Sequence, residues 1–162
     1  MRRGPGMETT RHLTATVYIV NDGATALHEH KRHGIRIPPG GPLDRGELPH
    51  ETARRECREE TGLTPRILPP EEATIEASDG RSIPRPRRLM LYDINGHDGE
   101  VGHQHVDQIF YATAPSREID PQDGEAGADA WTWDTEAELR DSDVASDVVT
   151  LGSKAIRAAE TR

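Results

Sequence analysis

One segment, GPLDRGELPHETARRECREETGL at residues 41–63, constrains the fold more than any other part of the chain. It places a proline in the first turn of an expected helix over residues 48–61, where a missing N–H is tolerated. Ala53 and Cys57 fall on one stripe of that helix, and Gly62 is a typical residue at a helix end. The segment therefore predicts a loop, a helix with one buried stripe and a turn, in that order.

Three glutamates on this helix, Glu56, Glu59 and Glu60, are related by steps of three and four residues and therefore share one face. Like charges at that spacing repel and weaken an isolated helix by roughly a few tenths of a kcal/mol per pair. A divalent cation would turn this repulsion into coordination. The face predicts a metal site, and the alternative is a solvated charged surface.

Ligands that are all oxygen favour Mg²⁺ or Mn²⁺ over Zn²⁺. Magnesium keeps several waters and recruits substrate phosphates, so the expected substrate is phosphorylated. The ion lowers the pKa of a bound water, a carboxylate accepts its proton, and cations offset the charge that develops on the phosphorus oxygens. This chemistry predicts hydrolysis of a phosphoanhydride.

The segment resembles the Nudix box, G-x5-E-x7-R-E-U-x-E-E-x-G-U, in which U is an apolar residue. Every fixed position is matched, by Gly41, Glu47, Arg55, Glu56, Glu59, Glu60 and Gly62. The first U position holds Cys57, a small buried hydrophobe in place of the usual aliphatic residue, and the second holds Leu63. The resemblance implies a Nudix (MutT-like) hydrolase of the α/β (α+β) class, an α/β/α sandwich with a mixed sheet, the Nudix loop–helix–loop and a C-terminal helix.

The resemblance also implies a role for each matched residue. The expected metal ligands are Glu56, Glu59, Glu60 and the carbonyl of Gly40. The expected catalytic residues are Glu56, Glu59 and Arg55, with Glu56 either a ligand or the base that acts on the attacking water. Glu47 is expected to orient the helical carboxylates together with Arg55, which is a better candidate for a glutamate partner than for a phosphate clamp.

Family members often take a further acidic ligand or base from beyond the box, at a position that the motif does not transfer. The candidates here are Glu100, Asp107, Glu118 and Glu125. For each of them the alternative is an ordinary solvated carboxylate.

Two clusters of other residue types are candidates for binding. The first cluster consists of the arginines around a proline-rich loop, Arg81, Arg85, Arg87 and Arg88. They are expected to bind substrate phosphates, and the alternative is that they only balance local charge. The sequence His103-Gln104-His105-Val106-Asp107 puts alternate residues on one face of a strand. Three roles stay open for this segment: a zinc site, hydrogen bonds to a nucleobase, or simple placement on the surface.

Length and charge limit the remaining functions. The 162 residues suit one domain, expected over residues 12–162 after a disordered tail over residues 1–11. The formal charge of −9 argues against non-specific binding to nucleic acid. The longest apolar stretch, roughly residues 15–20, is far too short to cross a bilayer, and no membrane partner is expected.

The cellular setting follows from two residue types. A single cysteine and the absence of a signal segment near the start favour the cytoplasm. Only two of the 20 basic residues are lysine, and an acidic chain of this kind resembles proteins of salt-adapted cytoplasms, which suggests a halophilic archaeon. A GC-rich genome would also favour arginine.

The rest of the chain alternates extended and helical patterns. Strands are expected from His12 through residue 20 and over residues 24–30, 35–37, 66–77, 87–95, 106–114 and 130–133, with a loop at residues 38–41. Asp134 is expected to cap a short helix, and Ser142 or Asp143 a longer one that ends near Glu160. In the longer helix Gly152 lowers helix propensity by ~1 kcal/mol relative to alanine.

The sequence therefore predicts a cytoplasmic hydrolase that uses Mg²⁺ or Mn²⁺ to cleave a nucleoside diphosphate linked to another moiety. Two alternatives stay open: a Nudix-fold module that binds a nucleotide without turnover, and an isomerase of isoprenoid diphosphates. The isomerase needs a reactive cysteine, and the core position of Cys57 disfavours it. The substrate within this class and the oligomeric state are not encoded in any motif of the chain.

Overall fold

The computed structural model describes residues 9–30, 34–69, 72–97 and 100–161. Its strands are β1 (Thr10–Asn21), β2 (Ala24–Glu29), β3 (Arg36–Ile37), β4 (Gly40–Pro42), β5 (Arg66–Ile67), β6 (Arg88–His97), β7 (Glu100–Thr113) and β8 (Trp131–Thr135). Its helices are α1 (Pro49–Thr61), α2 (Glu136–Asp141) and α3 (Ser146–Glu160), with a 3₁₀ turn at Ala128–Ala130. Within the described residues no helix has the length and apolar character needed to cross a membrane.

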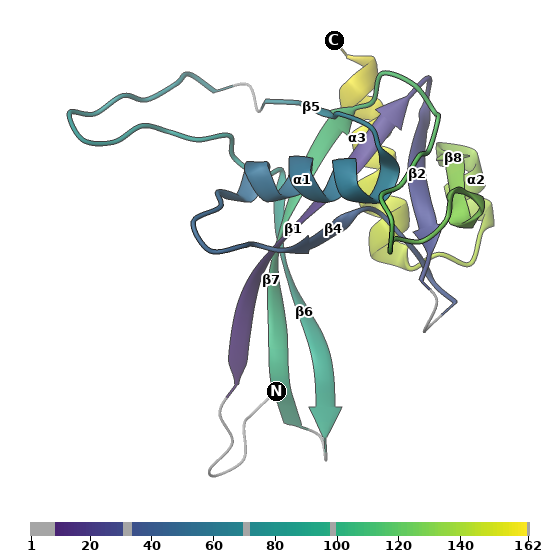
Figure 1. Ribbon diagram of the computed structural model, residues 1–162, viewed down its shortest axis with the longest axis horizontal. Coiled ribbons are helices and arrows are strands. Elements are labelled where there is room, and N and C mark those ends of the chain that lie inside the picture. Colours follow the sequence, from purple (N-terminus) through teal and green to yellow (C-terminus); the bar gives the residue numbers. More distant parts are fainter. Residues whose placement is uncertain (1–8, 31–33, 70–71, 98–99, 162) are drawn as a thin grey trace.

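All eight strands belong to one mixed sheet built around β1 (Figure 1). β1 pairs in parallel with β7 from Thr10 to Val20, and antiparallel with β2 and β4. β7 also pairs antiparallel with β6 and β5, and β2 with β3 and β8. Together β1, β6 and β7 extend beyond the helices as an arm, seen at the bottom of Figure 1.

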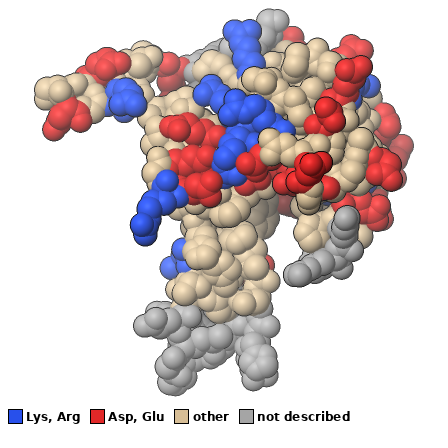
Figure 2. Space-filling model, viewed as in Figure 1, with Lys and Arg blue, Asp and Glu red and all other residues tan. Residues whose placement is uncertain are grey.

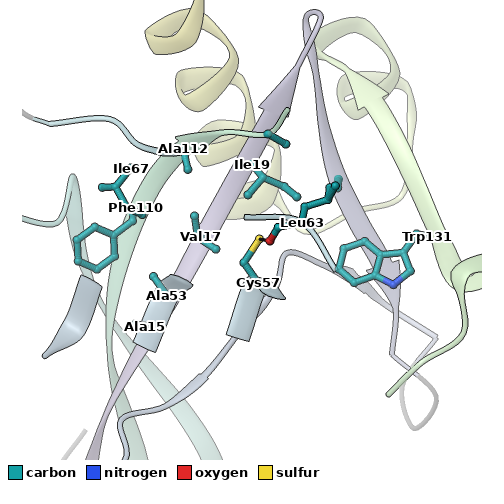
Figure 3. Packing of buried hydrophobic residues seen from close by; sticks show 12 residues of the cluster. Ala15, Val17, Ile19, Ala53, Cys57, Leu63, Ile67, Phe110, Ala112 and Trp131 are labelled. Carbon is teal, nitrogen blue, oxygen red and sulfur yellow. Dashed lines mark hydrogen bonds between the residues drawn. The ribbon is translucent and has the colours of Figure 1, made fainter. Parts of the chain in front are cut away.

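Alternation along β1 separates the core into two layers, one on each face of the sheet. Ala15, Val17 and Ile19 pack with the buried stripe of α1, whereas Tyr18 and Val20 pack with α2 and α3. Figure 3 shows the α1 layer, with Cys57 and Ala53 of the helix directed at the strands. The predicted α/β/α sandwich with a mixed sheet and a C-terminal helix is confirmed.

The neighbour of β1 changes along its length. Thr14, Ala15 and Thr16 pair with β4, but Val20 and Asn21 pair with β2. Between these pairings Val17 donates its N–H to the carbonyl of Pro39, 3.0 Å away. The candidate site described below lies where the partner of β1 changes from β4 to β2.

Several boundaries differ from the sequence prediction for physical reasons. Residues 40–41 form part of β4, because β1 supplies ladder partners to a segment whose glycines and prolines predicted a loop. β5 ends at Ile67, well short of the predicted residue 77, since prolines follow at positions 69 and 70 and cannot donate to a ladder. β7 begins at Glu100, before the predicted start at residue 106, because β6 pairs with it across that region.

β1 begins at Thr10, two residues before the predicted strand, because its first residues pair with the extended start of β7. Residues 1–8, which make up most of the predicted tail, lie outside the described residues.

The predicted helix caps were also wrong. Thr135, and not Asp134, caps α2 in a capping box with Glu138, because Asp134 is the buried partner of Arg36 on β3. Ser142 donates its hydroxyl to the carbonyl of Leu139 at 2.8 Å and so closes the end of α2. α3 therefore begins at Ser146, with Ala145 as its N-cap.

Gly152 has a packing role that helix propensity does not reveal. It is buried in α3 where the helix crosses α2, and a Cβ built there would lie 3.0 Å from Leu139 Cδ1. Leu139 is fully buried and has little room to shift. The glycine therefore lets α2 and α3 approach each other closely.

We expect Gly152→Val to lower the free energy of unfolding by about 2 kcal/mol, because overpacking a filled core typically destabilises a protein by that amount. Thermal or denaturant unfolding of the purified variant measures the change. Lys154→Val is the matched control, since Lys154 is exposed on the same helix and receives the same β-branched side chain. Equal stability losses in the two variants would contradict the packing role.

Candidate active site

The C-terminal end of α1 is fixed by a loop that docks against it. Gly62 ends the helix in the left-handed conformation, with φ of 76°. The backbone N–H groups of Asp120 and Gln122 donate to the carbonyls of Thr61 and Glu59, each at 2.8 Å. A Cβ at Gly62 would lie 2.3 Å from the Asp120 carbonyl oxygen, so only glycine fits. This docking brings the acidic loop around residue 125 next to the carboxylates of α1.

Arg55 is the centre of the charged network on α1. Its Nε donates to Glu47 Oε2 at 2.7 Å, and its Nη1 donates to Glu56 Oε1 at 3.0 Å and to Glu59 Oε2 at 3.2 Å. Its Nη2 donates to the carbonyl of Pro42 at 3.2 Å. The hydrogen bond with Glu47 is the main cause that raises the pKa of Arg55. Figure 2 shows acidic and basic side chains side by side over this face.

Glu47 holds the loop that leads into α1. Besides Arg55, its carboxylate accepts hydrogen bonds from the Thr52 hydroxyl at 2.6 Å and from the backbone N–H of Asp44 at 3.1 Å. The hydrogen bond with Arg55 has the largest effect, and together these bonds lower the pKa of Glu47 from 4.5 to about 2. Hydrogen bonds therefore link Glu47 through Arg55 to Glu56 and Glu59, and the predicted orienting role of the pair stays a prediction.

Glu60 lies deeper than the other carboxylates. Its Oε2 accepts the N–H of Gly40 at 2.9 Å, and its Oε1 lies 3.5 Å from Nε2 of His28. Burial, followed by the charges of Glu56, Glu125 and Glu59, raises the pKa of Glu60 to about 8. The hydrogen bond from Gly40 opposes that shift.

β4 lies directly against the carboxylates of the helix. A Cβ built on Gly41 would lie only 2.3 Å from Glu56 Oε1, so the backbone of β4 approaches the carboxylate as closely as a glycine allows. Burial raises the pKa of Glu56 as well. The glycine pair Gly40–Gly41 thus places backbone groups beside Glu56 and Glu60.

The arrangement fits a hard divalent cation. Glu56, Glu59 and Glu60 carry carboxylate oxygens on one helix, and the backbone of Gly40 in the adjoining strand contacts Glu60. Burial, and after it the charges of neighbouring carboxylates, raise the pKa of Glu56 and of Glu60, and a bound Mg²⁺ or Mn²⁺ would remove this electrostatic penalty.

A cavity of about 720 Å³ opens beside Glu60. Gly40, Gly41, Glu60 and Glu125 line the end next to α1. The remaining wall is formed by β1, β3, β6 and β7, and by the start of α3. A cavity of this size is typical of small-molecule sites.

A model of the NUDIX domain matches residues 10–151. The chain belongs to the Nudix family. Its Nudix box is the segment that contains α1, and solved structures similar to this chain include Nudix hydrolases.

Three solved structures illustrate the likeness. A Nudix-family hydrolase from Clostridium perfringens has 27% sequence identity to this chain. The match covers 93% of this chain and 99% of the hydrolase, with a TM-score of 0.80. A mutator MutT protein from Bacillus halodurans is 20% identical, with coverages of 90% and 82% and a TM-score of 0.62. A Nudix hydrolase from Nitrosomonas europaea is 19% identical, with coverages of 94% and 90% and a TM-score of 0.59. No curated protein matches the chain significantly.

The four acidic candidates outside the Nudix box have different positions. Glu125 lines the cavity, and its charge helps to raise the pKa of both Glu56 and Glu60. Asp107 lines the cavity too, but its two oxygens accept hydrogen bonds from the Thr14 and Thr16 hydroxyls. Glu118 is absent from the described cavity lining. The side chain of Glu100 lies outside the described residues.

The four arginines are not brought to the Nudix carboxylates. Arg81, Arg85 and Arg87 lie in residues 72–87, which project past the start of α1 at the left of Figure 1, and Arg88 begins β6. Glu56, Glu59 and Glu60 lie in the second half of α1. Arg85 pairs with Glu72 at 2.6 Å, and Arg87 donates to the Pro69 carbonyl and lies over the Tyr111 ring. The backbones of Arg81 and Glu76 form an isolated β-bridge, and Arg88 is opposite Ile109 in the ladder between β6 and β7. Their contact with substrate phosphate stays a prediction.

Sequence reasoning missed the residues that complete the cavity wall. His28 contacts Glu60 and stacks against Trp131, with ring centroids 4.8 Å apart. On the opposite side, the Tyr92 hydroxyl donates to Asp147 Oδ2 at 2.6 Å and so joins β6 to α3. Neither pair belongs to a local motif, and only the sheet topology brings their members together.

Cys57 is the buried U residue of the Nudix box. Its thiol lies 3.5 Å from the Thr61 hydroxyl and 3.6 Å from the Leu63 carbonyl, and burial raises its pKa to about 11. A protonated thiol of this kind is a poor nucleophile. This environment agrees with the predicted core position.

We expect Glu47→Gln to lower the free energy of unfolding by about 2 kcal/mol near neutral pH, because Arg55 loses a charged partner within a half-buried network. The folded-state pKa of Glu47 lies below its ordinary value of 4.5. Its stabilisation is therefore fully present above that value and is lost as the pH falls from about 4.5 towards 2.

Thermal unfolding of both proteins between pH 7 and pH 2 tests this dependence. Asp44→Asn is the matched control, because the Asp44 side chain is 69% exposed and lies 3.5 Å from the same Nε atom. Its substitution should change stability little. A stability difference between wild type and Glu47→Gln that stays constant down to pH 2 would rule out the assignment.

Proposed function

We propose that this Nudix protein is a divalent-metal-dependent hydrolase that cleaves a phosphoanhydride in a nucleoside diphosphate linked to another moiety, such as a nucleotide or a nucleotide sugar. Water attacks phosphorus. The observation that carries the proposal is the group of carboxylates on α1: Arg55 holds Glu56 and Glu59 together, and Glu60 lies with Gly40 in the wall of one cavity.

The residues that would hold Mg²⁺ or Mn²⁺ are Glu56, Glu59, Glu60 and the carbonyl of Gly40. When bound, the ion supplies positive charge that favours ionised water and offsets the charge on the phosphate oxygens. Arg55 and Glu47 act before the ion binds, because their hydrogen bonds hold Glu56 and Glu59 in place. This order in the free protein reduces the conformational entropy lost when the ion binds.

Glu125 is the proposed base that accepts the proton of the attacking water. Glu56 is the other candidate, but its Oε1 already accepts a hydrogen bond from Arg55 and lies against β4, which suits a positioned ligand. Glu125 instead reaches the cavity from the loop docked on the end of α1. A carboxylate at the cavity wall can meet a water molecule next to a bound phosphate.

The cavity supports a substrate with a polar and an apolar part. Hydroxyls of Thr14 and Thr16 and the ring of His28 offer polar contacts, while Ile35 and Ile37 offer apolar surface. At about 720 Å³ the cavity is large enough for a nucleoside diphosphate with a further group attached.

The test is product analysis after incubation with nucleoside triphosphates, ADP-ribose, sugar nucleotides and dinucleoside polyphosphates. Each substrate is assayed with Mg²⁺, Mn²⁺ or chelator, at low and at high KCl because the proposed cytoplasm is salt-adapted. We expect metal-dependent cleavage that falls at least about 100-fold in Glu59→Gln, since this variant removes a charged ligand. Unfolding curves verify that the variant is folded.

Glu51→Gln is the matched control, because Glu51 is exposed in the first turn of the same helix and should leave turnover unchanged. Binding of nucleotide without consumption would favour the module that only senses its ligand. Conversion of an isoprenoid diphosphate without release of phosphate would favour the isomerase. Either result would overturn the proposal.

We expect Glu125→Gln to reduce kcat by about 100-fold or more while KM stays within a small factor, because the base acts in the chemical step and not in binding. Steady-state kinetics on the best substrate measures both constants. Glu118→Gln is the control from the same loop. A change in KM alone would assign Glu125 to substrate binding, and an unchanged kcat would return the role of base to Glu56.

A further inference from the structure

Three histidines gather on the arm of the sheet, separate from the Nudix carboxylates. His12 comes from β1, and His103 and His105 come from β7. The parallel register places His12 opposite His105, and alternate residues of β7 share one face. One nitrogen from each ring lies within 4.8 Å of the other two.

The rings form a continuous group. The centroids of His12 and His103 are 4.5 Å apart, and those of His103 and His105 are 5.2 Å apart, with edge-to-face angles of 75° and 88°. Burial first, and then the charges of His103 and His12, lower the pKa of His105, while the charge of Asp107 opposes that shift. His105 therefore favours the neutral imidazole, the form that binds metals.

Thr10 fixes the orientation of the central ring. Its hydroxyl donates to the Gly102 carbonyl at 3.2 Å, so it is an acceptor for Nδ1 of His103, which lies 2.8 Å away. A proton on Nδ1 leaves the lone pair of His103 on Nε2. This is the arrangement in which a hydrogen-bond partner holds a metal-binding histidine in one tautomer.

We propose that His12, His103 and His105 form a second metal site, selective for Zn²⁺ and similar transition ions. Three imidazole nitrogens are a ligand set that Mg²⁺ disfavours and Zn²⁺ prefers, and water completes a tetrahedron. Ligand nitrogens around tetrahedral zinc lie about 3.3 Å apart, so small ring rotations close the observed spacing. Because His105 also lines the cavity, the site borders the space in which the substrate is proposed to bind.

Zinc titration of the untagged full chain tests the site, with excess Mg²⁺ present to occupy the carboxylates. We expect one Zn²⁺ per chain and a higher melting temperature with zinc, because an ion that binds only the folded state stabilises it. Co²⁺ in place of zinc should give the intense visible bands of four-coordinate nitrogen ligation.

The variants His12→Ala and His103→Ala should weaken Zn²⁺ binding by about 100-fold or more, and Thr10→Ala by about tenfold, with recovery in Thr10→Ser. Gln104→Ala controls for changes in the strand, because Gln104 lies on β7 and its side chain contacts Arg11 and Asp93 instead. His50→Ala controls for the loss of a histidine elsewhere. Zinc affinity equal in wild type and His103→Ala, or no zinc bound by wild type, would overturn the proposal.

Discussion

The hydrogen bonds of one guanidinium group organise the site of this protein. Arg55 joins the loop before α1, through Glu47 and the Pro42 carbonyl, to Glu56 and Glu59 on the helix itself. The negative charges of Glu47, Glu56 and Glu59 can lie close together because the guanidinium of Arg55 lies among them. Glu60 lacks that cation and is stabilised instead by the N–H of Gly40, which makes β4 as necessary to the site as the helix. Loop, helix and strand are therefore one electrostatic unit.

The sheet supplies the space next to this unit. β1 leaves β4 and joins β2 within a few residues, and the cavity lies at that change of partner. The same strand carries polar residues on its cavity face, where Thr14 and Thr16 bind Asp107 of β7. Further along the arm the same face carries His12, beside His103 and His105. The proposed oxygen ligands and the proposed nitrogen ligands are therefore both reached from this one strand.

The sequence was most informative where function depends on local spacing. The helix of the Nudix box, its end at Gly62, the core position of Cys57 and the partnership of Arg55 with Glu47 all follow from residues close in the chain. Contacts between distant segments were not predictable. The interactions of His28 with Glu60 and of Tyr92 with Asp147 depend on how strands and helices pack. Ser142 was misassigned because a hydroxyl suits either helix end, and only the carbonyl of Leu139 decides between them.

The close contact at Gly152 also affects the shape of the cavity. Val144, Asp147 and Val148 form part of its wall, and the last two belong to α3, whose distance from α2 is set by the missing side chain at position 152. A larger residue there would push the helices apart and move this wall, together with the Tyr92 hydrogen bond that ties it to β6. The volume available to a ligand is thus controlled in part by a residue that touches neither the ligand nor the Nudix box.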